Sequence, residues 1–120
     1  MNKMQTLQAF WGGFGIPAYD ENTVPDDAVL PYITYEASSD DFGNTMLRNA
    51  SLWYRSSSWA EITAKEQQIA DFITRGGRMV GYDGGAMWIK RANPWAQRMS
   101  EPSDDSIRRI VLSYNIEFLD

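Results

Sequence analysis

The chain has 120 residues, no cysteine and no histidine, and its 16 acidic and 11 basic side chains give a formal net charge of −5. This composition excludes disulfides, thiolate nucleophiles and imidazole bases, and with them the commonest hydrolytic and zinc-dependent mechanisms. The excess of acid argues against a dedicated nucleic-acid-binding protein, because binding to phosphates relies on basic side chains.

Length and hydropathy predict one folded domain spanning residues 1–120. Hydrophobic residues make up 43% of the chain and charged residues 22%, which is typical of a globular domain with one core. No apolar run approaches the roughly 20 residues that cross a bilayer, and residues 1–7 do not have the pattern of a signal peptide. We therefore expect a soluble protein that stays in the cytoplasm in which it is made.

The first predicted element is a helix, and an acidic loop follows it. Apolar residues recur every three or four positions from Met4 to Phe14, which indicates an amphipathic helix that Gly12 and Gly13 end. Prolines and clustered carboxylates from Ala18 to Pro31 predict a long loop. A connection of this length usually has a binding or assembly role. Its acidic candidates are Asp20, Glu21, Asp26 and Asp27.

The middle of the chain predicts a hairpin, a helix and a second hairpin. Residues 32–37 and 46–55 are rich in β-forming residues and flank a predicted turn at residues 40–44. Ser58 and Glu61 have the spacing of a capping box, so a helix should follow and end at Gly76–Gly77. Beyond it, residues 78–82 and 86–91 flank Asp-Gly-Gly, a tight-hairpin signal.

The last third of the chain predicts an irregular segment and one long strand. Residues 93–105 read as irregular and contain Trp95, Arg98 and Met99, residue types that are enriched at protein interfaces. Trp95 fits either an interface or local packing. Residues 107–119 alternate between apolar and polar side chains, the clearest strand in the sequence. The order αββαβββ predicts an α+β fold in which an antiparallel sheet of about five strands packs one face against two helices.

No catalytic, metal or cofactor site is predicted. Adjacent carboxylates suggest a hard cation, but no segment has the spacing of a calcium-binding loop, and such pairs are common in solvated turns. Trp53 and Trp88, in predicted strands, either point into the core or form exposed stacking surfaces with Trp95. A small carbohydrate-binding module is therefore one alternative, and an enzyme is not expected.

Charge is distributed unevenly along the chain. Residues 1–60 carry three basic and seven acidic side chains, whereas residues 75–109 carry seven basic and four acidic ones. This asymmetry suits head-to-tail association of identical subunits, although ordinary solvated charges would also produce it.

Whole segments of the sequence resemble the tail terminators of long-tailed bacteriophages and prophages, also called tail-completion or minor tail-component proteins. The resemblance extends in order over nearly all of the chain. It rests on residues 14–28, 30–36, 50–59, 83–89, 94–99 and 104–109.

The resemblance implies a structural virion protein with helices packed on an antiparallel sheet. Such proteins form a ring, usually a hexamer, on the last ring of the tail tube, stop tube growth and present the other face to the head. It implies the tube protein and a head-completion or connector protein as partners, with DNA passing through and no sequence-specific contact. Assembly would occur in the host cytoplasm and the protein would remain in the virion tail. A head-completion or minor capsid adaptor is the nearest alternative, because such proteins share size and composition.

Overall fold

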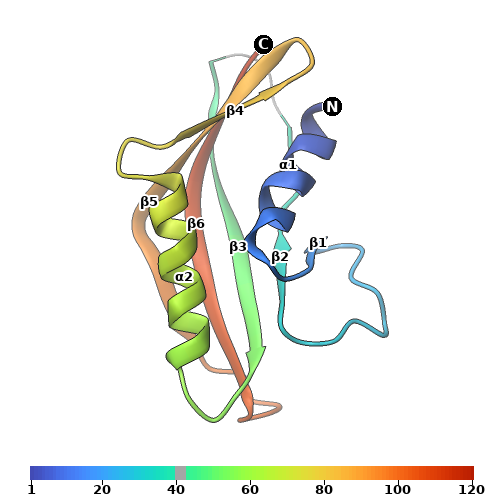
Figure 1. The fold of residues 1–120 in the computed structure, drawn as a ribbon, viewed down its shortest axis with the longest axis vertical. Coiled ribbons are helices and arrows are strands. Elements are labelled where there is room, and N and C mark those ends of the chain that lie inside the picture. The colour runs from blue at the N-terminus through green and yellow to red at the C-terminus, as the bar shows by residue number, and fades with distance from the viewer. Residues whose placement is uncertain (40–42) are drawn as a thin grey trace.

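The computed structural model describes residues 1–39 and 43–120, and within them two α-helices and six strands form an α+β domain (Figure 1). The predicted class is therefore confirmed. In chain order the elements are α1 (Lys3–Trp11), the 3-10 turn η1 (Gly12–Phe14), β1 (Ala18–Asp20), β2 (Tyr32–Tyr35), β3 (Thr45–Arg55), α2 (Ala60–Ile73), β4 (Arg78–Tyr82), β5 (Gly85–Met99) and β6 (Ile107–Leu119).

The strands form one mixed sheet in the order β1-β2-β3-β6-β5-β4. The pair β1–β2 is parallel and the other neighbours are antiparallel. The predicted five-stranded antiparallel sheet, and with it the order αββαβββ, is therefore wrong by one strand. Residues 18–20, expected in the acidic loop, form β1, which is too short to produce an alternating pattern. Two backbone hydrogen bonds at the ends of the β1–β2 pairing fix β1 against β2. Ile33 N donates to Pro17 O (2.8 Å), and Glu21 N donates to Tyr35 O (2.9 Å).

The long strand β5 corrects a second expectation. Residues 93–99, predicted as irregular, continue β5 alongside β6. The sheet accommodates Pro94, which has no N–H to donate, because the pairing register shifts between Arg91 and Ala96. A proline therefore interrupts the ladder here without ending the strand.

The helix α1 ends at Trp11, directly before Gly12 as predicted, whereas both termini of α2 differ from the sequence pattern. The capping box expected at Ser58 and Glu61 does not form. Instead α2 begins at Ala60, whose N–H donates to Ser58 Oγ at 3.0 Å. It ends at Ile73, before the two glycines, and Thr74 has a positive φ of 69°. A capping box does begin α1, where the side-chain oxygens of Asn2 and Gln5 each accept a hydrogen bond from the backbone N–H of the other residue.

Both predicted hairpins are present, and β6 has the expected limits. Pairing of β2 with β3 forms the first hairpin, and residues 40–42 of its predicted turn lie outside the described residues. In the second, Tyr82 pairs with Gly85, which leaves Asp83–Gly84 as the turn. Gly84 has φ 89°, a conformation that favours glycine.

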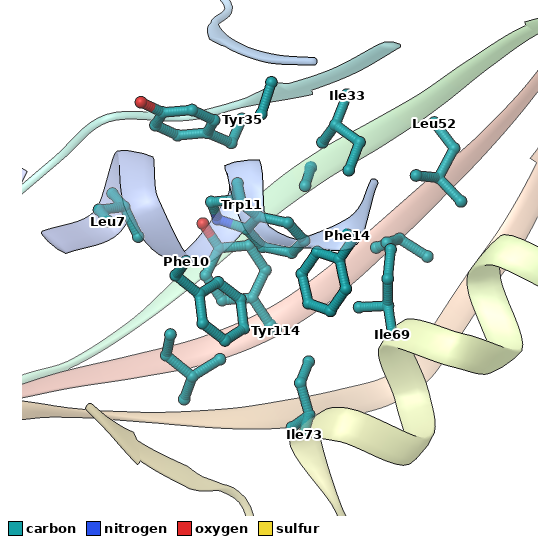
Figure 2. Close-up of a cluster of buried hydrophobic side chains, with 14 of the residues drawn as sticks. Leu7, Phe10, Trp11, Phe14, Ile33, Tyr35, Leu52, Ile69, Ile73 and Tyr114 are labelled. Carbon is teal, nitrogen blue, oxygen red and sulfur yellow. The ribbon is translucent and has the colours of Figure 1, made fainter. Parts of the chain in front are cut away.

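One face of the sheet carries the core, and both helices cover it. Alternate side chains of β6 are buried, and Tyr114 among them lies against Trp11 of α1 with ring centroids 5.3 Å apart (Figure 2). Ile69 and Ile73 of α2 are fully buried in the same cluster. Intervening β6 residues such as Val111 are only half-buried, because α1 and α2 both lie on the other face.

Neighbouring residues of β6 provide a test of this one-sided burial. Replacing the fully buried Leu112 by alanine should lower the free energy of unfolding by about 2–5 kcal/mol, because it leaves a cavity under the helices. The matched control Val111→Ala, on the uncovered face, should cost less than about 1 kcal/mol. Denaturant unfolding measures both values, and equal losses would contradict the assignment of faces.

Candidate functional site

The acidic loop between β1 and β2 remains the clearest candidate for assembly, and it projects beyond the edge of the sheet in Figure 1. Its start is ordered by Asp20, whose Oδ1 accepts from Asn22 N at 2.9 Å. Glu21, Asp26 and Asp27 are exposed. Within residues 1–39 and 43–120 none of these four carboxylates forms a salt bridge, so the loop carries uncompensated negative charge.

Trp95 packs against the neighbouring helix. Its Nε1 donates to Glu66 Oε1 of α2 at 2.8 Å, and the ring lies at the margin of the core. Local packing therefore accounts for the position of this indole. A role for Trp95 in contacts between copies stays a prediction.

The other two residues of this candidate segment point to opposite faces of the sheet. Arg98 pairs with Ile110 and so lies on the helix-covered face, with its guanidinium 4.7 Å from the Trp59 ring. Met99 pairs with Arg109 on the uncovered face and is 40% exposed. Strand alternation thus divides the 95–99 segment, which the sequence alone presents as one surface.

The structure does not bring the acidic loop and the 95–99 segment together. The loop leaves β1 at one edge of the sheet, whereas the segment belongs to β5, with β2, β3 and β6 between them. They are two separate surfaces of one copy, which is the arrangement that head-to-tail association requires.

Tryptophan rings on the uncovered face each have a cation beside them. Trp53 donates to Thr34 Oγ1 at 2.9 Å and has the Arg109 guanidinium 4.4 Å from its ring centroid. Trp88 donates to Gly76 O at 3.2 Å, and Lys90 Nζ lies 4.1 Å from the ring. Since Trp95 belongs to the α2 side, the three indoles do not form one stacking platform.

An aromatic and polar cluster on the uncovered face was not predicted from the sequence. Tyr19 of β1 and Tyr32 of β2 meet edge to face at 5.6 Å. Tyr32 pairs with Trp53 of β3, and Trp53 pairs in turn with Arg109 of β6, whose guanidinium donates to Ser51 Oγ. Four strands contribute to the cluster, so no local run of sequence could reveal it.

The connection between β5 and β6 is closed by Asp104. Its Oδ1 accepts from Ser106 N and Oγ at 2.9 and 2.7 Å, and its Oδ2 accepts from Arg55 Nη1 at 2.9 Å. The hydrogen bonds from Ser106 and then from Arg55 lower the pKa of the Asp104 carboxyl to about 2. This network ties the loop to the end of β3.

The described ranges contain neither a metal-binding cluster nor a membrane-spanning helix. No group of three or more acidic side chains there has an arrangement that could hold a metal ion. None of the helices in the same ranges is long and apolar enough to span a bilayer.

Comparison with solved structures matches this fold to a chain of the virion of a native gene transfer agent particle. The TM-score is 0.55 with 21% sequence identity, and the match covers 95% of this chain and 89% of that chain. The two chains therefore share a fold over nearly their whole lengths. No protein-family model matches the sequence, and no curated protein matches it.

The bond between Trp95 and Glu66 predicts a measurable contribution to stability. Trp95→Phe keeps an aromatic ring but removes the N–H, and should lower the free energy of unfolding by about 1 kcal/mol. Glu66→Ala, which removes the acceptor, should then cost less in that variant than in the native chain, because the bond is already gone. Denaturant titration of the single and double variants checks this, and full additivity of the two losses would contradict it.

The Asp104 network predicts a specific dependence of stability on pH. A folded pKa of about 2, below the ordinary 3.8, means that the ionised group stabilises the fold above about pH 4 and that this contribution disappears as the pH falls toward 2. The gap in denaturant midpoint between the native chain and Asp104→Asn should therefore be present at pH 6 and shrink toward pH 2. The control Asp105→Asn, at an exposed neighbour, should show no such narrowing, and a gap independent of pH would contradict the assignment.

Proposed function

We propose that this chain is a structural protein of a phage-type virion and, more specifically, a tail terminator. The observation that carries the virion role is the fold shared with a chain of a gene transfer agent virion, which covers 95% of this chain. The tail-terminator role rests on the resemblance of residues 14–28, 30–36 and 94–99, with the segments that follow them in order, to that family.

In this role, copies of the chain assemble into a ring, with six as the proposed number. One face of the ring caps the tail tube and ends its polymerisation, and the other meets a head-completion or connector protein. Two separate candidate surfaces on one copy, the acidic loop and the 95–99 segment, support contacts with different neighbours. The proposed place of assembly is the host cytoplasm, and the finished ring stays in the tail.

The excess of acidic side chains suits a ring through which DNA passes. A net charge of −5 disfavours adhesion to phosphates, so the chain is proposed to let DNA through without sequence-specific binding. The proposed function involves no catalysis and no cofactor.

A head-completion or minor capsid adaptor is the second candidate. The matched chain belongs to a virion, and a virion contains both head and tail components, so the shared fold fits either location. Gene order separates the two, since a position between the head-completion genes and the major tail gene is expected for a terminator.

A tube-capping assay tests the proposed function. The purified chain, added to the polymerising tube protein of the same phage, should shorten the tubes in a dose-dependent way, and electron microscopy should show a ring at one end. Light scattering after size-exclusion chromatography measures the mass of the ring in solution. A strict monomer at high concentration, together with unchanged tube lengths, would contradict the proposal.

A further inference from the structure

An open apolar groove lies on the helix side of the molecule, between α1, the end of α2 and β4. Its volume is about 240 Å³. Three phenylalanine rings form its wall. The ring centroid of Phe72 in α2 lies 5.5 Å from that of Phe14 and 6.0 Å from that of Phe10. Figure 2 shows Phe10 and Phe14 side by side. Phe72 is 44% exposed although it contacts both rings, so the groove leaves apolar surface uncovered in a single copy.

The size of the groove favours a protein side chain as its occupant. Pockets for small molecules usually measure about 300–1,000 Å³, and this groove is smaller and open. Its lining is almost entirely apolar, since Thr6 is the one lining residue in the described part of the chain with a polar side chain. An exposed aliphatic side chain on a projecting loop would fill such a surface.

Two cations bind backbone oxygens of residues that line the groove, and neither forms a salt bridge with a carboxylate of the described residues. Lys65 Nζ donates to the backbone oxygen of Phe14 at 2.5 Å. The Arg78 guanidinium donates twice to the backbone oxygen of Phe72, at 2.9 and 2.7 Å, and stacks 4.1 Å from the centre of that ring. Among the salt bridges of the described residues, none involves Lys65 or Arg78. Two positive charges beside Phe14 and Phe72 are therefore available to carboxylates of a neighbour.

The acidic loop has the complementary combination of groups. Val29 is 78% exposed, the highest value among the large hydrophobic side chains described, and it follows Asp27 by two residues. Asp26 and Asp27 are exposed and carry no salt bridge to any residue in the described ranges. An apolar side chain beside two carboxylates matches an apolar groove beside two cations.

The loop and the groove of one copy do not meet. In Figure 1 the loop projects past β1 and β2, away from α2 and β4, which form two sides of the groove. The exposure of both Val29 and Phe72 agrees with this separation. A loop that fills this groove must therefore come from a second copy of the chain.

We propose that residues 21–31 of one copy dock in the groove of the next, with Val29 against the three phenylalanine rings and Asp26 and Asp27 beside Lys65 and Arg78. Because the two surfaces differ, the contact repeats head to tail and closes into a ring when the rotation between copies permits. The inference rests on the proposed ring and specifies the contact that builds it.

The absence of cysteine in the chain allows a direct cross-linking test. A variant with Val29→Cys and Ala9→Cys places one thiol on the loop and one in the groove. Oxidation of this variant, either by itself or assembled on the tube protein, should give covalent dimers, trimers and longer ladders. The matched control, Val29→Cys with Ser113→Cys on the uncovered face, should form no products longer than dimers.

The cross-linked products also identify a wrong partner. A disulfide within one chain would overturn the proposal, because the loop would then reach its own groove. A disulfide from the loop thiol of the Val29→Cys variant to a cysteine placed in the tube protein, without ladders, would overturn it in favour of that protein. A ring that persists by light scattering without any cross-link between loop and groove overturns the loop–groove contact and leaves the proposed function standing.

A second variant measures the contribution of the apolar contact without a cross-link. Val29→Asp should weaken self-association by about tenfold or more, because it puts a charge where the proposed contact would bury the exposed valine side chain. The control Leu47→Asp alters another accessible aliphatic residue, 60% exposed on β3, and should leave association unchanged. Sedimentation velocity gives the self-association constants of both variants. Equal effects of the two substitutions would overturn the proposal, and a native chain that stays monomeric even on the tube protein would overturn the ring as well.

Discussion

The packing of Trp11 against Tyr114 is the contact on which the remaining structure depends. Tyr114 lies in β6, which pairs with β3 on one side and β5 on the other, and both aromatic side chains are fully buried. Burial also raises the pKa of the Tyr114 hydroxyl, as expected for a phenol enclosed in the core. By fixing α1 across the centre of the sheet, this contact sets one wall of the groove and leaves the opposite face of the sheet uncovered.

The surface chemistry follows from that placement. With the helices on one face, the β1–β2 loop extends past the edge of the sheet, and its carboxylates find no basic partner among the described residues of the same copy. Lys65 and Arg78 bind backbone oxygens beside exposed Phe72 on the other side of α1. Unpaired charges of opposite sign, each beside exposed apolar surface, are the physical basis for proposing that the chain associates with copies of itself.

Long periodic elements could be predicted from the sequence, and short or long-range features could not. The alternation in β6 and the Asp83–Gly84 turn are predicted correctly because each signal is local. The three residues of β1 have no periodicity of their own, and their strand exists only through pairing with β2. For the candidate site, the exposure of the acidic loop followed from its composition. The division of the 95–99 segment between two faces depends on the register with β6. The groove depends on contact of α1 with α2 and β4, which lie far from it in the sequence.

The location of the chain in assembled particles tests the central claim most directly. A gold-labelled tag at the C-terminus, imaged by electron microscopy, should appear at one place per particle, at the end of the tail tube that joins the head. Labels distributed along the tube, at the distal tip or over the capsid surface would contradict the account of this chain as a terminating ring.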